Sequence, residues 1–221
     1  MATEASKTRA LWSAEVLGLM KGDGIDIGCG PDPIFPQVDR FDQEHGDANE
    51  ISRFVSKRYD FVFSSHCLEH MRDPYAAFKE WFSLVKPGGH LVVLVPDEDL
   101  YEQGCFPSVF NSDHQFTFTI SKARSWSPKS VNVLDLARSV PGELVSVQLQ
   151  DHGIDRALLN FGSSRWGVRL GRWARKLSDR LPTVERMIHR VFRKFGAIID
   201  QTNFREPRLA QIQLILRKPG A

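Results

Sequence analysis

Cysteine is scarce in this chain, and no stretch of the sequence is both long and apolar. The three cysteines, Cys29, Cys67 and Cys105, are isolated and show no metal-ligand spacing, so neither a disulfide framework nor a structural zinc site is expected. No apolar run approaches the length of a membrane span, and the N-terminal sequence MATEASKTRA lacks the apolar core of a secretory signal. These absences favour a reduced, cytoplasmic protein without a bound metal.

The net charge of +2 is small, but it is unevenly distributed. Residues 163–195 contain ten Lys or Arg and two acids, a net charge of +8, so the rest of the chain carries −6. A near-neutral body that carries one basic segment favours an anionic partner or surface for that segment.

The remaining composition is that of one globular domain. The chain has 221 residues, of which 42% are hydrophobic and 25% charged, enough for a single α/β domain with a sizeable core. We expect residues 1–8 to be disordered and residues 9–20 to form a helix. Apolar runs predict strands at about 24–28, 36–39, 59–64, 90–95, 144–149 and 210–216, and a short one around 115–118. Further helices are expected at about 74–85 and from Ser127 to Ser139.

The most informative motif is Gly24-Ile25-Asp26-Ile27-Gly28-Cys29-Gly30, a short apolar strand that ends in a glycine turn. Gly28 and Gly30 carry no Cβ, so a nucleotide-like cofactor can approach the backbone there. A dinucleotide site of the G-x-G-x-x-G type is disfavoured because Pro33 occupies its third glycine position. Asp26 suits a cationic ligand better than a pyrophosphate.

Residues 24 to about 97 resemble the class I S-adenosylmethionine-dependent methyltransferases. Five segments carry the resemblance in the expected order: GIDIGCG (24–30), QVDR (37–40), GDA (46–48), YDFVFSSHCLEH (59–70) and LVKPGGHLVVLVPD (84–97). The resemblance implies a Rossmann-like sheet of seven mostly parallel strands with an antiparallel last strand. It also implies S-adenosylmethionine as the cofactor.

The same resemblance assigns cofactor-binding residues. Asp39 corresponds to the acid that accepts from the ribose hydroxyls. The link from Gly30 to Asp39 is short and proline-rich, so Asp42 is the alternative. Asp47 and Ala48 border the adenine, although an aspartate in this position also suits a helix N-cap. The rest of the expected cofactor set is Asp26, Gly28, Cys29, Gly30, Ser64 and Ser65.

Roughly sixty residues separate the last two expected strands, and a helical insertion at about 152–205 fills this distance. Two apolar stripes at helical spacing lie beside arginines: Trp166, Leu170, Trp173 and Leu177, then Val184, Ile188, Val191 and Phe195. The insertion is either a helical cap with solvated arginines or a platform for an anionic substrate or a membrane surface. Nucleic acid is the least favoured partner, because no known binding module is visible.

Acceptor-side residues should follow the ends of the strands, near the cofactor. This places Ser65, His66 and Glu69 after one strand and Asp97 after the next, with His114 on the following loop. His66 is the first candidate for a general base and His114 the second, because histidine titrates near neutral pH. His70 is interpreted as structural, with Glu69 bridging to backbone. The sequence contains no cluster of carboxylates that would indicate a catalytic metal site.

A weaker similarity concerns the acceptor. Residues 95–119, Asp200-Gln201-Thr202 and residues 210–218 look similar to small methyltransferases of bacterial surface-polysaccharide biosynthesis. This similarity implies O-methylation of a sugar in a cell-surface glycan or lipid-linked saccharide, which agrees with an anionic acceptor near the basic segment. Alternatives are a small-metabolite or protein acceptor, a non-catalytic cofactor-binding module and, more distantly, a nicotinamide dehydrogenase. The chain could also form an oligomer.

Overall fold

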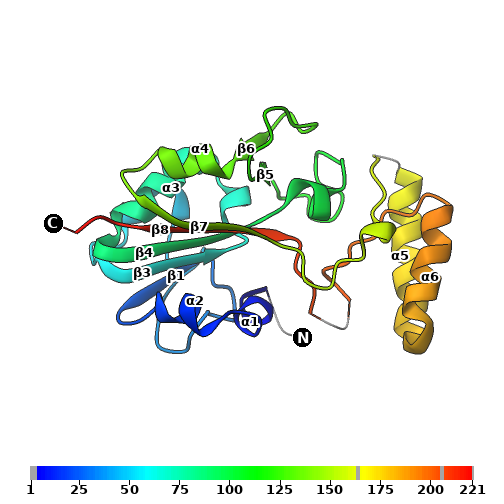
Figure 1. Ribbon diagram of the computed structural model, residues 1–221, viewed down its shortest axis with the longest axis horizontal. Coiled ribbons are helices and arrows are strands. Elements are labelled where there is room, and N and C mark those ends of the chain that lie inside the picture. Colours follow the sequence, from blue (N-terminus) through cyan, green and yellow to red (C-terminus); the bar gives the residue numbers. More distant parts are fainter. Residues whose placement is uncertain (1–3, 163–164, 205–206, 221) are drawn as a thin grey trace.

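A central sheet with helices on both faces forms the body of the protein (Figure 1). The computed structural model describes residues 4–162, 165–204 and 207–220. Within them, six strands pair in the order β2-β1-β3-β4-β8-β7. They are β1 (Gly24–Ile27), β2 (Asp39–Phe41), β3 (Tyr59–Ser65), β4 (Val85–Pro96), β7 (Glu143–Gln150) and β8 (Gln211–Arg217). β8 is antiparallel to β4 and β7, whereas β2, β1, β3 and β4 are mutually parallel. The predicted Rossmann-like α/β fold is therefore confirmed.

The two faces of the sheet bury separate apolar clusters. Along β4, Leu91 and Val93 pack with α3 (Pro74–Ser83) and α4 (Val133–Arg138), whereas Val92 and Leu94 pack against the N-terminal helices. Those are α1 (Glu4–Arg9) and α2 (Ala14–Gly18), which lie on the opposite face in Figure 1. A strand that is buried on both faces reads as a continuous apolar run, which explains why β4 was recognisable in the sequence.

Helix α3 holds the chain between β2 and β3 in place. The Asp73 side chain accepts hydrogen bonds from the amides of Tyr75 and Ala76, and Pro74 occupies the first turn, so the helix start is well determined. From the buried face of α3, Trp81 Nε1 donates to the carbonyl oxygen of Ala48 at 2.8 Å. The helix thereby holds the chain between β2 and β3 against the sheet.

The described sheet has six strands instead of the seven expected. After β2 ends at Phe41, the chain reaches the 3₁₀ helix η1 (Ala48–Arg53) and continues to β3 without another strand. A further parallel strand would need a crossover of a dozen or more residues on each side. The chain between Phe41 and Ala48 is too short to supply one.

The N-terminal segment also differs from expectation. Residues 4–8 of the predicted disordered tail lie in α1, where Ser6 Oγ donates to Asp32 and Thr8 Oγ1 accepts from Gln211 Nε2. Residues 1–3 are outside the described part. The single helix predicted at 9–20 is interrupted, because the Ser13 side chain accepts from the Val16 amide and starts α2 as a new helix.

A buried carboxylate organises the segment that follows β4. η3 (Glu98–Glu102) is one turn of π-helix, and Glu98 accepts from Lys122 Nζ, Ser125 Oγ and Ser130 Oγ. A two-stranded sheet of β5 (Thr117–Thr119) and β6 (Ser130–Asn132) lies beside it. The strand predicted around 115–118 is thus found as β5. The helix predicted from Ser127 to Ser139 starts later than predicted, because the Asn132 side chain caps the first turn of α4.

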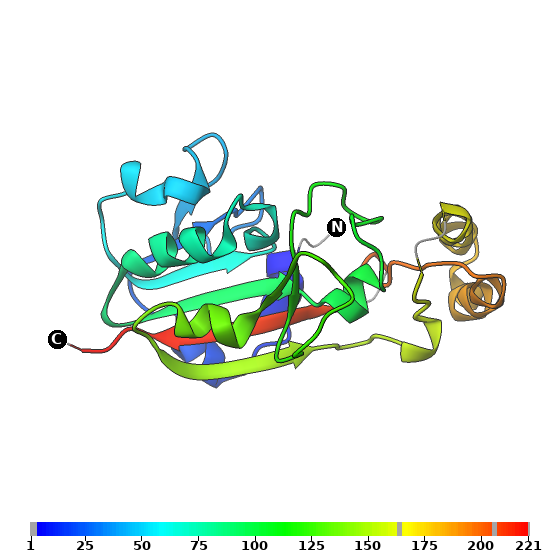
Figure 2. The same cartoon turned by 90° about the horizontal axis from the view of Figure 1, so that it is seen from above.

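The insertion forms a helical hairpin, as predicted. After the 3₁₀ turn η4 (Arg156–Leu158), α5 (Arg165–Arg180) and α6 (Glu185–Lys194) lie side by side, joined by the short η5 (Pro182–Val184). Gly167 and Gly171 allow residues 196–198 to pack directly on α5, where a Cβ would collide with that backbone. Figures 1 and 2 place this hairpin beyond the end of the sheet at which the parallel strands terminate. Among the described helices, none combines the length and the apolar character needed to cross a bilayer.

Candidate functional site

The parallel strands end at a cleft of about 1090 Å³, called here the large cleft. Its lining comes from the glycine turn, the loop after β2, the turn after β3 and the loop before β5: Gly28, Asp42, Gln43, Gly46, Asp47, Ala48, Asn49, His66, Cys67, His70, Met71, Ser112, Asp113 and Gln115. A smaller cavity of about 170 Å³, the small cavity, shares His66 and His70 with it and reaches Thr202 and Asn203 of the insertion. The carboxyl ends of parallel strands are where open α/β sheets bind ligands.

The glycine turn packs closely against the Cys67 side chain. Gly28 has φ 77°, and a Cβ there would lie 2.6 Å from Cβ and Sγ of Cys67. Its amide donates to the Phe41 carbonyl at 2.8 Å, and the Gly30 amide donates to Asp42 Oδ2 at 2.6 Å. The turn is therefore tied to the end of β2, and only glycine fits at its first position.

Of the two candidate ribose acids, the structure brings Asp42 to the large cleft and leaves Asp39 outside it. β2 begins at Asp39, three residues later than the start predicted, so Asp39 pairs with Ile25 below the end of the sheet. There it is exposed and accepts from Lys57 Nζ and the Tyr59 hydroxyl. Asp42 follows directly after the last residue of β2 and lines the cleft.

Asp47 and Ala48 both line the large cleft, as predicted. Asp47 caps η1 and accepts from the amide and side chain of Asn49 and from Arg72. The hydrogen bonds from Asn49, with a further contribution from Arg72, lower its carboxyl pKa to about 2. The helix-capping role considered for Asp47 is therefore present, and the same carboxylate is an ionised group at the cleft wall.

Four other predicted cofactor residues lie behind the turn and not in the lining of the large cleft. Asp26 is 1% exposed and accepts from the Ile34 amide, and burial raises the pKa of its carboxyl to about 7. Cys29 is buried next to Arg40, and burial raises its thiol pKa. Ser64 donates to the Ile27 carbonyl, whereas Ser65 Oγ is buried without a hydrogen bond in the described structure. Of these four residues, Asp26 and Ser64 hold backbone groups next to the turn.

His66 sits where the large cleft meets the small cavity. Its φ of 52° is unusual for a residue other than glycine, and such left-handed conformations cluster at functional sites. Its amide donates to Leu94 O, and Nε2 lies 2.8 Å from Gln211 Oε1. The Gln211 amide nitrogen already donates to Thr8 and Gln150, so Oε1 accepts from a protonated Nε2. The other ring nitrogen, Nδ1, lies 3.5 Å from Glu69 Oε1 and is the position at which the ring can exchange a proton.

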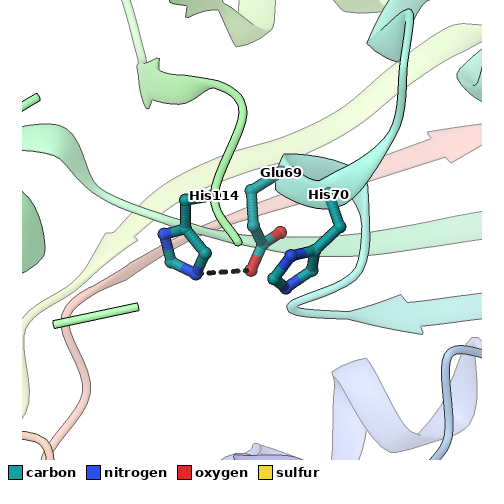
Figure 3. Close-up of side chains that lie close together, drawn as sticks. All are labelled: Glu69, His70 and His114. Atoms are coloured by element: carbon teal, nitrogen blue, oxygen red, sulfur yellow. Dashed lines mark ion pairs between the residues drawn. The ribbon is translucent and has the colours of Figure 1, made fainter. Parts of the chain in front are cut away.

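His114 lies in the small cavity within a buried cluster of acids and histidines (Figure 3). Its Nδ1 is 2.6 Å from Glu102 Oε1, and its Nε2 is 3.8 Å from Glu69 Oε1. His66 Nδ1 approaches the same Glu69 oxygen at 3.5 Å. The His70 ring stands edge-on to the His114 ring, with 5.0 Å between centroids. Both predicted histidines thus meet around one carboxylate.

Glu69 differs from its predicted role. Its side chain is completely buried, and neither carboxylate oxygen has a hydrogen bond within the described structure, so it does not bridge to backbone. Burial alone would raise its carboxyl pKa, but His66, His114 and His70 together hold that pKa below the usual range. Asp97, another predicted acceptor-side residue, caps η3 by accepting from the Asp99 and Leu100 amides. Burial raises the pKa of Asp97 to about 6.

Two residues that contact the histidines of the small cavity could not be identified from the sequence. Glu102 is the last residue of η3 and lies twelve residues before His114, with no spacing rule that links the two. Gln211, at the start of β8, reaches His66 from 145 residues away. A single sequence contains no local pattern for such tertiary contacts.

Comparison with known proteins gives one family match. Residues 6–129, more than half of the chain, match the profile described as a methyltransferase domain. A candidate sarcosine dimethylglycine methyltransferase from Galdieria sulphuraria superposes with a TM-score of 0.52 at 13% identity, over 97% of this chain and 85% of that one. A SAM-dependent methyltransferase from Archaeoglobus fulgidus gives a TM-score of 0.48 at 16% identity, over 96% and 92%. No curated protein matches the chain.

Proposed function

The chain belongs to the methyltransferase-domain family and uses S-adenosylmethionine as its methyl donor, and we propose that it methylates an oxygen of a saccharide acceptor. The observation that carries the proposal is a small, polar cavity that adjoins the large cleft, with His66 at the junction. The donor supplies a methyl group already activated on a sulfonium. The protein therefore has to align the acceptor and take up its proton.

The large cleft fits the donor on two observations. Gly28 contributes backbone without a side chain to the cleft lining. The Asp42 carboxylate lies at the end of β2 with one lone pair on each oxygen not used by its two amide contacts. We assign the ribose hydroxyls to Asp42. Asp47 and Ala48, further along the cleft wall, would border the adenine.

The small cavity supports an acceptor of limited size. Its volume of about 170 Å³ is below the roughly 300–1,000 Å³ of sites for drug-sized ligands, so it takes one unit of a larger acceptor, such as a single sugar ring. Asn111, Thr202 and Asn203 offer hydrogen-bonding groups that suit sugar hydroxyls. Because Thr202 and Asn203 belong to the insertion, the insertion would contribute to acceptor recognition.

His66 is the proposed general base. It borders both cavities, and its contact with Gln211 directs the proton to Nδ1. An acceptor hydroxyl in the small cavity would lose its proton to Nδ1 as the oxygen takes the methyl group. Proton transfer from the acceptor to a positioned histidine typically increases the rate about 10²–10⁴-fold.

The acceptor class is tested with methyl-labelled S-adenosylmethionine and an envelope extract from a strain that lacks the protein. Label in the glycan or glycolipid fraction is the expected result, because the resemblance to surface-polysaccharide methyltransferases and the small cavity both favour a sugar. Label only in small metabolites or in protein would overturn the saccharide proposal. Tight binding of S-adenosylhomocysteine without transfer to any fraction would favour a non-catalytic cofactor-binding module.

We further propose that the hairpin of α5 and α6 docks on an anionic lipid surface. One side of each helix is buried, through residues such as Ala174 and Ile188. Another stripe on each helix stays exposed, with Trp173 at 58% and Phe195 at 71% exposure. The exposed apolar residues of the hairpin are Trp166, Trp173, Leu177, Leu181, Met187, Val191 and Phe195.

Charge supports lipid as the occupant of this surface. Residues 163–195 carry a net charge of +8, and exposed basic side chains such as Arg172, Lys176 and Lys194 accompany the apolar stripes. Basic helices with exposed Trp and Phe are typical of segments that lie in the interface of anionic membranes. A lipid-linked saccharide would then be presented next to the insertion residues of the small cavity.

Vesicle flotation tests this docking. Binding to vesicles with phosphatidylglycerol, weakened by salt and absent on pure phosphatidylcholine, is the expected result. The double variants Trp173→Ser/Phe195→Ser and Arg172→Glu/Lys176→Glu should each reduce it strongly. Leu144→Ser, which changes an apolar residue of similar exposure (50%) on β7, is the matched control and should bind normally. Equal binding of all variants, or none by the native protein, would contradict the proposal.

A further inference from the structure

The strongest feature that methyl transfer does not use is the unsatisfied carboxylate of Glu69. The side chain is 0% exposed, and both of its oxygens lack a hydrogen-bond partner in the described structure. The nearest ring nitrogens, His66 Nδ1 at 3.5 Å and His114 Nε2 at 3.8 Å, are farther from Oε1 than a normal hydrogen bond. Buried charges are normally hydrogen-bonded or bound to a metal.

Two histidines converge on this carboxylate (Figure 3). One potential ligand atom from each of Glu69, His70 and His114 lies within 4.8 Å of the other two. Ligand atoms around a single ion with bonds of about 2.1 Å sit roughly 3–3.5 Å apart. The 3.8 Å between His114 Nε2 and Glu69 Oε1 is already close to that spacing, so a small inward movement would complete it.

The second contacts of both histidines are those of metal ligands. A metal-binding histidine usually donates its other ring N–H to a carboxylate or a backbone carbonyl, which orients the ring and leaves a lone pair for the ion. His114 Nδ1 makes such a contact with Glu102 at 2.6 Å, and His70 Nδ1 makes one with the Asp113 carbonyl at 3.1 Å. The other ring nitrogen of His114, Nε2, faces Glu69.

From these contacts we infer that Glu69, His70 and His114 form a binding site for a divalent transition-metal ion such as Zn²⁺, Mn²⁺ or Co²⁺. Two imidazoles and one carboxylate suit this class of ion and leave coordination positions open. The open positions would face the small cavity, which all three residues line. If the acceptor proposal holds, the ion would bind and orient the acceptor hydroxyl beside His66. The site itself rests only on the geometry of the three residues.

The site departs from the expectation that no metal binds. Glu69 and His70 are adjacent, but His114 comes from a separate loop that is held by its own backbone contacts: the Gln115 amide donates to the Glu69 carbonyl at 2.8 Å. The cluster therefore exists only in the folded chain. The spacing of the three residues along the sequence does not indicate the cluster.

Titration of the chelator-treated full-length protein with CoCl₂ tests the site without donor or acceptor. We expect one equivalent of Co²⁺ to bind with visible absorption bands of a nitrogen- and oxygen-ligated ion. Glu69→Gln and His114→Ala should abolish this binding, and Glu102→Gln, which alters only the support of His114, should weaken it about 10–100-fold. His152→Ala changes an exposed histidine outside the cluster and should bind as the native protein does.

Cooperative thermal unfolding is measured on every variant as the check on folding. His70→Ala, at a half-buried ring, is the variant least expected to disturb the structure, and it should lose Co²⁺ while it unfolds as cooperatively as the native protein. Absence of stoichiometric Co²⁺ binding by the native protein overturns the inference, and so does binding that persists in Glu69→Gln, His70→Ala and His114→Ala. Neither result depends on whether the acceptor is a saccharide, because no acceptor is present.

Discussion

The large cleft and the small cavity meet at His66 and His70, but their polar groups are stabilised in different ways. On the cleft side, the carboxylates of Asp42 and Asp47 accept hydrogen bonds from backbone amides. On the cavity side, Glu69 and Glu102 keep buried oxygens that no described residue satisfies. Because unpaired buried polar atoms cost free energy, the cavity side is where the proposed metal ion would stabilise the protein most.

The largest effect that separates the two sites is expected from His66→Asn. Asparagine tolerates the left-handed backbone at this position but cannot act as a general base. The initial rate of methyl transfer to the envelope extract should fall about 10²–10⁴-fold, while calorimetric affinity for S-adenosylhomocysteine stays within about threefold. Equal losses of rate and affinity would show that His66 shapes the cleft instead.

His45→Asn is the matched change on the cleft side. The Asp42 amide donates to His45 Nδ1 at 3.1 Å, and neither cavity includes His45 in its lining. The variant should retain the native transfer rate at saturating donor. A rate loss as large as that of His66→Asn would mean that any histidine change near the site is disruptive.

The buried acid beneath the glycine turn predicts the next effect, on stability. The pKa of Asp26 is raised from 3.8 to about 7 by burial, so the protonated form is favoured in the folded chain. This stabilisation is complete below the unfolded pKa and is lost as pH rises through the folded one. At about 1.36 kcal/mol per pH unit, Asp26→Asn should gain about 3 kcal/mol relative to the native protein between about pH 4.5 and 7.5. Denaturant unfolding at several pH values measures it.

Asp60→Asn provides the control for this titration. Hydrogen bonds from the Asp23 amide and from Lys86 lower the Asp60 pKa, so its carboxylate is ionised over the whole range in both states. Its stability relative to the native protein should therefore stay constant with pH. A flat profile for Asp26→Asn as well would show that Asp26 is ionised in the fold.

A smaller effect on both stability and affinity is expected within the glycine turn. Gly28→Ala combines a positive φ with a Cβ that meets Cys67 at 2.6 Å, whereas Gly30→Ala has the positive φ but nothing within 4 Å. Left-handed backbone costs an alanine about 1–2 kcal/mol. Gly30→Ala should lose about that much unfolding free energy. Gly28→Ala should lose about 1 kcal/mol more and bind S-adenosylhomocysteine at least tenfold more weakly. Equal effects in the two variants would leave only backbone strain as the cause.

The contrast between the sites also explains what the sequence could predict. The glycine turn and the Asp47 cap are local, so their residue types and order were informative on their own. The strands were recognisable because buried parallel strands are continuously apolar. The Glu69 and Glu102 contacts with His114 join separate loops, and no local pattern records such pairs.

The hairpin of α5 and α6 was predictable only in part. Helical periodicity predicted α5 and α6, and the break at Leu181-Pro182 is found where expected. Periodicity could not say which apolar residues pack, because Leu170 and Trp173 are both apolar, yet one is 8% exposed and the other 58%. That choice depends on residues 196–199, which are far along the chain and cover only one side of α5.

The smallest predicted effect compares the two candidate ribose acids. Asp42→Asn should weaken S-adenosylhomocysteine binding about tenfold, since hydrogen bonds to a charged group contribute about 1.5 kcal/mol or more. Asp39→Asn should leave that affinity unchanged and cost only the exposed contacts with Lys57 and Tyr59. Calorimetric titration of both variants decides between them. If Asp39→Asn had the larger effect, β2 would have to end near residue 39 in the ligand-bound protein, and the Phe41 carbonyl could no longer accept from the Gly28 amide. The two assignments of the ribose acid therefore differ in the register that they require of one short strand.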